Sequence, residues 1–282
     1  MKATFISWLA ALLLIFMTAM AASCSKQRLD RGHNCQLVAS IEPLRAIVAE
    51  IAGEDWQVSA IVPQGFSPED YSPSAAQMAE IADTRCIFKV GRLGFETVYL
   101  PQVQKAMPDL NIVDTSEGIG EATFDPHTWM LPDNIKIIAA NVCRVLSQVD
   151  SVNATVYAER LRALEVRTDS LDSEIRHLLA DVRSRTFIIT HPALTHFAAH
   201  YGLRQLAIEP DGKEPTPNSV RALITQAKAD SAQVIFVQQE FSDRSARMIA
   251  EQTGVRVVSI NPLADDWYGE LLRIAQALND GR

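Results

Sequence analysis

The sequence predicts an α/β protein of two lobes, each with a central, mainly parallel sheet flanked by helices, joined by one long rigid linker helix. Strand-like and helical runs alternate in residues 37–113, and the same alternation returns in residues 186–278. Between them, residues 153–181 form a helical stretch that contains neither Gly nor Pro. Such alternation is typical of parallel sheets covered by helices, and a chain of 282 residues is long enough for two lobes.

The first lobe is expected to span residues 37–152. Its short apolar runs predict strands at 37–41, 57–62, 86–90 and 111–113. Helical periodicity predicts helices at 43–51, 73–82, 95–103 and 133–149. Gly53 is expected to end the first of these helices, and Pro63 the second strand.

Residues 153–182 are assigned to the linker helix, because Leu and Ile recur near helical spacing while Arg, Asp and Glu fill the gaps. At about 1.5 Å per residue this helix would span about 40 Å, more than one lobe needs. The second lobe then covers residues 183–282. Its expected strands are 186–190, 204–208, 233–237 and 255–260, and its expected helices are 193–201, 217–229, 243–253 and 267–278.

The N-terminus has the layout of a secretory signal. Lys2 precedes an apolar run at 5–20, and small residues stand directly before Cys24. Small residues followed by Cys resemble a bacterial lipobox. We therefore expect residues 1–23 to be a lipoprotein signal peptide, Cys24 to be lipidated and residues 24–36 to be a polar tether. A plain signal peptide and an uncleaved anchor are the alternatives.

Composition narrows the class of partner. Removing residues 1–23 removes one Lys and no acid, so 25 basic and 34 acidic residues leave a charge of −9. An acidic chain disfavours nucleic acid as a partner and mildly favours cations. Three cysteines remain after Cys24, an odd number. We expect Cys86 and Cys143 to be buried free thiols, with a bridge from Cys35 left open.

Potential metal ligands follow the predicted strands of both lobes. They are Glu69, His127, His191, Gln238, Glu240 and Asn261. Ligands of open parallel sheets bind beyond the carboxyl ends of the strands. Two imidazoles and a carboxylate suit zinc, although the wide spacing of these residues along the chain makes the pattern weak evidence on its own.

Several motifs resemble those of the metal-specific solute-binding proteins of ABC importers, the zinc and manganese receptor family. The matching stretches are 51–53, 61–91, DPHTW (125–129), HPALTHFAAHYGL (191–203), EPTP (214–217), VIFVQQEFS (234–242) and SINPL (259–263). Their order is that of the family. The resemblance implies two α/β lobes joined by a rigid helix and a metal bound between the lobes.

The family's ligand positions carry over with two substitutions. Its second and third histidines match His127 and His191. Glu69 stands where the family has its first histidine, and Asn261 where it often has an aspartate. The resemblance thus implies Glu69, His127, His191 and Asn261 as ligands. Further candidates for a second-shell role or a substitute ligand are Asp125, Glu209, Gln238 and Glu240.

His196 and His200 are spaced i,i+4, which could place both imidazoles on one helix face. However, Leu194, Phe197 and Tyr201 define the buried side of that helix. We therefore expect both histidines to be exposed and neither to be a ligand.

The sequence therefore predicts a non-enzymatic, monomeric receptor on the periplasmic face. It would carry Zn²⁺, or alternatively Mn²⁺, to the permease and ATPase subunits of an ABC importer and be held to the bilayer through Cys24. A metallohydrolase or an adhesin with a zinc site are the alternatives, although no H-E-x-x-H motif is present. Because the linker lacks a hinge residue, metal should order loops 64–72 and 117–129 and leave 160–178 unchanged.

Overall fold

The computed structural model describes residues 36–82, 84–120, 125–210 and 215–280. The predicted signal peptide, Cys24, Cys35 and nearly all of the tether lie outside the described residues. Within them, none of the helices combines the length and the apolar character that a membrane span requires. Cys86 and Cys143 are free and buried, which confirms that prediction.

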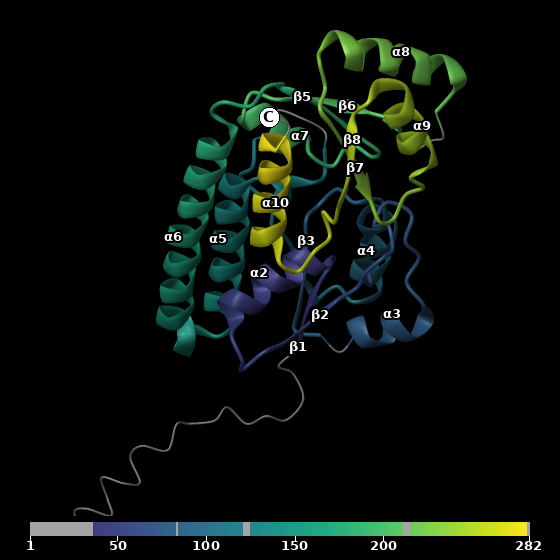
Figure 1. Cartoon of the computed structure of the whole chain (residues 1–282). Helices are drawn as coiled ribbons and strands as arrows, with labels where there is room; N and C mark the ends of the chain where they lie inside the picture. The colour runs from purple at the N-terminus through teal and green to yellow at the C-terminus, as the bar shows by residue number, and fades with distance from the viewer. Residues whose placement is uncertain (1–35, 83, 121–124, 211–214, 281–282) are drawn as a thin grey trace, which may run out of the picture. The chain divides into compact units, whose positions relative to one another are not determined.

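The first sheet is parallel and contains β1 (Gln36–Ala39), β2 (Gln57–Ala60), β3 (Cys86–Lys89) and β4 (Asn111–Asp114) in the order β2-β1-β3-β4. Helices α2 (Glu42–Ala52), α3 (Ala75–Ala82) and α4 (Gly94–Ala106) connect these strands (Figure 1). The central strands β1 and β3 are apolar and buried apart from Gln36 and Lys89 at their ends, as parallel strands covered on both faces require. The sheet therefore fixes the loops that leave its carboxyl edge.

The second sheet repeats this topology. It contains β5 (Thr186–Ile189), β6 (Arg204–Ala207), β7 (Val234–Gln238) and β8 (Arg256–Ile260) in the order β6-β5-β7-β8, again parallel. Its helices are α7 (Thr195–His200), α8 (Pro217–Ala229), α9 (Arg244–Thr253) and α10 (Trp267–Asn279). In both sheets the first strand is central and pairs with the second and the third. The expected two-sheet architecture is confirmed.

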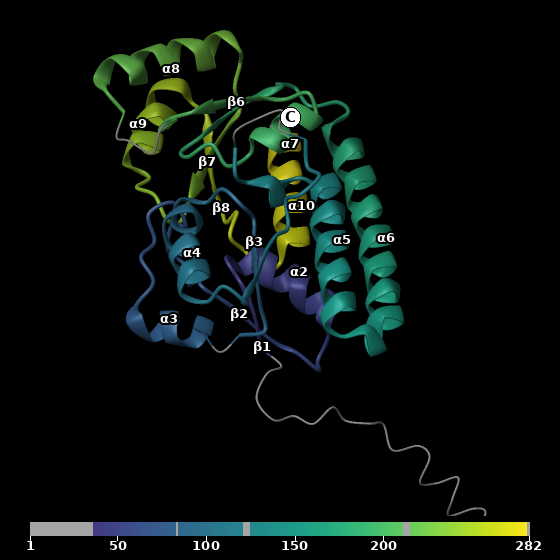
Figure 2. The same cartoon turned by 180° about the vertical axis from the view of Figure 1, so that it is seen from behind.

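Two long helices lead from one sheet to the other. The 3₁₀ turn η1 (Thr128–Met130) opens into α5 (Pro132–Val149), and the turn η2 (Ser151–Asn153) then opens into α6 (Ala154–Leu179). Both views show α5 and α6 side by side (Figure 1, Figure 2). α6 also packs against α2 of the first half and α10 of the second. One helix thus contacts elements of both halves.

Side chains of α6 fasten it to its neighbours. Arg160 Nη1 donates to the carbonyl oxygens of Ala52 (2.6 Å) and Ile51 (3.1 Å) at the end of α2. Gly53 follows at φ 76°, where any Cβ would overlap the Arg160 guanidinium. Arg167 pairs with Glu50 of α2, and its guanidinium lies 5.2 Å from the ring centroid of Trp267 of α10. These contacts oppose bending of α6 between the halves.

The first and last residues of the helices and strands differ from the expected ones by up to three residues. α3 starts at Ala75 rather than residue 73, because the Ser74 hydroxyl accepts a hydrogen bond from Gln77 N. α7 starts at Thr195 rather than residue 193. The preceding residues form a turn in which Ala193 N donates to the carbonyl oxygen of His191. His191 therefore lies in the turn before the helix and not in α7 itself.

Candidate metal centre

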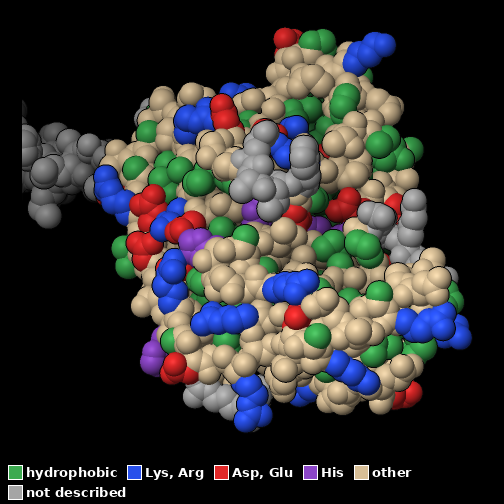
Figure 3. Space-filling model, turned by 90° about the horizontal axis from the view of Figure 1, so that it is seen from above, with side chains coloured by type: hydrophobic (Ala, Val, Ile, Leu, Met, Phe, Trp, Pro, Cys, Tyr) green, Lys and Arg blue, Asp and Glu red, His purple; other side chains and the backbone are tan. Residues whose placement is uncertain are grey.

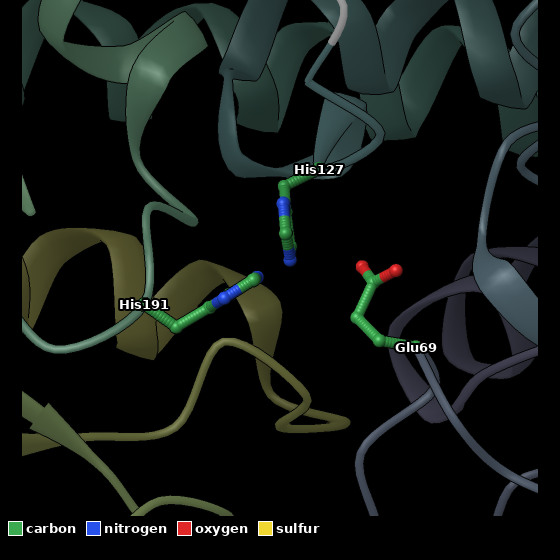
Figure 4. A group of neighbouring side chains, drawn as sticks. All are labelled: Glu69, His127 and His191. Carbon is green, nitrogen blue, oxygen red and sulfur yellow. The ribbon is translucent and has the colours of Figure 1, made fainter. Parts of the chain in front are cut away.

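Three side chains from different loops meet beyond the carboxyl ends of the strands. Glu69 follows β2, His127 follows β4 and His191 follows β5. One ligand atom from each lies within 4.8 Å of the others, and Figure 4 shows the three side chains pointing toward a common point. In Figure 3, histidine and acidic side chains gather in a groove across the face. The two halves of the chain therefore contribute to one cluster.

The three side chains line a cavity of about 20 Å³. Its other lining residues are Ser67, Pro68, Ala193, Gln238, Glu240, Phe241, Pro262 and Leu263. A space of about 10–15 Å³ already holds one water molecule. The cavity accordingly has room for a single ion or water.

Asp125 fixes the ring of His127. Oδ1 of Asp125 lies 2.5 Å from Nδ1 of His127 and accepts a second hydrogen bond, at 2.9 Å, from the backbone N–H of His127. Burial alone would raise the pKa of Asp125, but the hydrogen bonds and charge of His127 outweigh it and lower that pKa to about 2. An ionised carboxylate only accepts, so Nδ1 of His127 carries a proton toward Asp125, and Nε2 is the ring nitrogen left to bind a metal.

His191 is held through its backbone rather than its ring. Gln238 accepts from His191 N at 3.0 Å and donates to His191 O at 2.7 Å, and the imidazole stacks on Phe241 with ring centroids 4.9 Å apart. Both ring nitrogens are buried, and neither has a hydrogen-bond partner among the described residues. Burial and the charge of His127 lower the pKa of His191 to about 4. The ring is therefore neutral, with a lone pair available.

Glu69 lies at the N-terminus of α4. Its carboxylate accepts a hydrogen bond from Gly94 N–H, the first residue of that helix. Burial nevertheless raises the pKa of Glu69, and the charge of His127 opposes this only in part. A Cβ at position 94 would overlap the carbonyl oxygen of Glu69, so only glycine permits this approach. Gly94 therefore lets the loop that carries Glu69 pack closely against the N-terminus of α4.

The remaining predicted residues occupy different positions. Asn261 does not line the cavity, because its Oδ1 accepts from Leu263 N at 3.1 Å and its N–H donates to Glu270. Glu209 does not line it either, whereas Glu240 does, and burial raises the pKa of Glu240. The structure thus brings ligand atoms of Glu69, His127 and His191 together, while Asn261 as a ligand stays a prediction.

The prediction that His196 is exposed is wrong. His196 is only 9% exposed, and its Nε2 lies 2.8 Å from the carbonyl oxygen of Asp125. The helical pattern assigns one buried side, but α7 is short and packs both on β6 and on η1. The prediction that His200 is exposed is also wrong, because His200 is half-buried beside Asp133, Asp172 and Arg176. No pattern within α7 points to a partner 71 residues away.

Two parallel sheets that share one cluster of imidazole and carboxylate groups define a two-lobed metal-binding receptor. The chain matches the model of ZnuA, the periplasmic component A of the zinc-uptake complex, over residues 37–280, and it belongs to this family. It is accordingly a solute-binding receptor of ABC metal-uptake systems.

Individual proteins agree with this assignment. The chain is 24% identical to the high-affinity zinc uptake system protein ZnuA of Bacillus subtilis (strain 168), over 88% of this chain and 85% of that protein. It is 22% identical to the manganese ABC transporter substrate-binding lipoprotein PsaA of Streptococcus anginosus, over 88% and 87%. A crystal structure of ZnuA superposes with a TM-score of 0.83 at 30% identity, covering 87% of this chain and 98% of that one. The fold prediction and the predicted family are confirmed.

Proposed function

We propose that this protein captures one Zn²⁺ ion with Glu69, His127 and His191 and delivers it to the permease and ATPase subunits of an ABC importer. The observation that carries the proposal is the ring of His191. Its two nitrogens are buried without a hydrogen-bond partner among the described residues, beside the lone pair of His127 and the Glu69 carboxylate. An unsatisfied buried polar group costs about 1–3 kcal/mol, which a metal bond would offset.

The ligand chemistry favours zinc over manganese. Two imidazoles and one carboxylate are common zinc ligands, and zinc takes a fourth ligand in tetrahedral sites. Manganese prefers a larger share of oxygen ligands. Glu240 lines the cavity and could add a second carboxylate, which keeps Mn²⁺ as the alternative cargo. Water or Glu240 supports the fourth position better than Asn261, which would have to release Leu263 N.

Binding of a single metal ion explains the size of the cavity better than hydrolysis of an organic substrate does. A catalytic zinc keeps an open position for substrate and a general base beside it. The cavity of about 20 Å³ matches a single ion or water. The size of the site therefore favours a non-enzymatic role.

We further propose the organisation around this centre. Residues 1–23 are a signal peptide, Cys24 is lipidated and the tether of residues 24–36 holds a monomer at the periplasmic face. Residues 37–152 and 183–282 form the lobes, and residues 153–182 the rigid linker. The small-residue motif before Cys24 and the contacts of α6 with α2 and α10 support these boundaries.

The test uses a soluble fragment that starts at residue 25. The purified protein should hold one equivalent of zinc by mass spectrometry, and zinc should displace manganese in a competition titration. A protein that binds neither metal, or that prefers calcium, would rule out the proposal. Hydrolysis of ester or peptide substrates that depends on zinc would favour the enzyme alternative.

A further inference from the structure

α7 of the second half holds the loop that carries His127. The Nε2 atom of His196 lies 2.8 Å from the carbonyl oxygen of Asp125. A carbonyl oxygen can only accept, so Nε2 of His196 carries the proton and donates it. α7 of the second half thus contacts the backbone of Asp125 through His196.

Asp125 passes this restraint to His127. One oxygen of its carboxylate accepts from both the ring Nδ1 and the backbone N–H of His127. His196 therefore holds the backbone of the same residue whose carboxylate holds the ring of His127. His191 lies only five residues before His196, so one short segment carries one cluster residue and fixes another.

We propose that His196 is a positioning residue of the metal centre. By holding the Asp125 backbone, it keeps the Nε2 lone pair of His127 directed at the ion beside His191. The inference rests on the proposed function, because it requires His127 to bind the metal. Loss of a partner that orients a metal ligand typically lowers affinity by about 10–100-fold. His196 contacts Asp125 and not His127 itself, so we expect a loss of zinc affinity at the lower end of this range, about tenfold.

Removing the donor and restoring it provide the test. His196→Leu deletes the hydrogen bond, whereas His196→Gln keeps an N–H donor of similar reach. Zinc affinity of the fragment that starts at residue 25 should fall about tenfold in His196→Leu and less than about threefold in His196→Gln. His200→Leu is the matched control, since His200 lies one turn further along α7 and contacts Asp172 and Arg176 instead. It should bind zinc like the parent protein.

A spectroscopic readout separates positioning from packing. In the metal-free parent, long-range ¹H–¹⁵N NMR should show His127 as the Nδ1–H tautomer, because Asp125 accepts from that nitrogen. His196→Leu should populate the other tautomer, and His196→Gln should not. Should His196→Leu fail to fold, His196→Phe keeps an aromatic ring while removing the donor, and it should cause a similar loss of affinity with the same change of tautomer.

Each of the following outcomes would overturn the proposal. Unchanged affinity in folded His196→Leu or His196→Phe would show that α7 does not act on His127. An equal loss in His200→Leu, or a loss without any change of tautomer, would indicate general destabilisation of the helix. If the parent binds zinc but His127→Ala binds it equally well, the ligand assignment fails as well. If the parent binds no metal, the proposed function itself is wrong.

Discussion

The two loops that the first half contributes to the cluster differ sharply in how they are held. Residues 127–131 are all buried, and Trp129 is fully so. The Trp129 indole N–H donates to the Pro262 carbonyl oxygen of the second half at 2.7 Å, and Asn134 donates to Thr128 O. Around Glu69, by contrast, residues 63–66 are exposed, and Phe66 keeps 55% of its surface in solvent.

The loop that carries His127 (residues 125–131) is therefore a fixed platform, whereas the loop that carries Glu69 (residues 64–72) is a movable arm. Displacing His127 would break hydrogen bonds into both halves and expose buried side chains. Displacing Glu69 would break the bonds of Ser67 Oγ with Glu69 N and of Phe95 N with Pro68 O, at 3.2 Å each, and the hydrogen bond from Gly94 N–H to the Glu69 carboxylate. Local opening starts where few buried contacts are lost. The metal would therefore meet His127 and His191 first, and Glu69 would close on it.

The largest effect should come from the fixed side of the cluster. We expect His127→Ala to weaken zinc binding more than the roughly 100-fold that loss of an outer-shell partner can cost, because it removes a pre-positioned ligand. Glu69→Ala should cost less, about 10–100-fold, since ordering the arm offsets part of its contribution. Calorimetric or competition titration gives both numbers. A larger loss for Glu69→Ala would reverse the roles of the two loops.

His191 belongs to the platform, and its burial should be visible in the metal-free protein. Its pKa is about 4 in the folded chain and near 6.5 when unfolded. The unfolded state therefore binds the extra proton first, and stability should be lost as pH falls from about 6.5 to about 4, by at most about 3 kcal/mol. Denaturant unfolding across this range measures the slope.

Replacing His191 by Leu removes the titrating group and the unsatisfied nitrogens together. This variant should bind zinc poorly yet be more stable without metal, by about 1 kcal/mol at neutral pH. It should also lose the dependence of stability on pH. A pronounced destabilisation of the metal-free variant would show that His191 serves the fold rather than the site.

Hydrogen exchange tests the contrast between arm and platform directly. The sequence predicts metal-dependent ordering of both 64–72 and 117–129. The burial of residues 127–131 removes that part of the second loop from our expectation, whereas residues 117, 118 and 120 are exposed. Backbone amides of 64–72 should gain protection on adding zinc, while those of 125–130 and 160–178 should already exchange slowly. Equal gains in both loops would mean that the platform is not preformed.

Much of this arrangement could be predicted from the sequence because it depends on local pattern. Strand-to-helix alternation, the lack of Gly and Pro in residues 153–181 and the DPHTW motif are visible without coordinates. Contacts between distant segments are not. The bond of His196 with Asp125 and that of Trp129 with Pro262 depend on how the halves pack, and no spacing encodes them. Asn261 shows the converse, since its position matches a motif while its side chain binds the local backbone.

The smallest expected effect concerns the distance between the halves. α6 contains no Gly or Pro, and a sharp kink usually needs Pro, Gly or a π-bulge. Arg160 and Arg167 fasten it to both halves, and the Trp129–Pro262 and His196–Asp125 bonds join the halves again near the metal centre. Closing the arm over the ion requires none of these contacts to move. Small-angle scattering should therefore give the same radius of gyration with and without zinc.

Combining Trp129→Phe with His196→Leu removes both bonds near the centre, and any metal-dependent change in radius should be larger in that variant. A marked compaction of the parent protein on binding zinc would show that the halves close on the metal and that α6 is not a rigid connection.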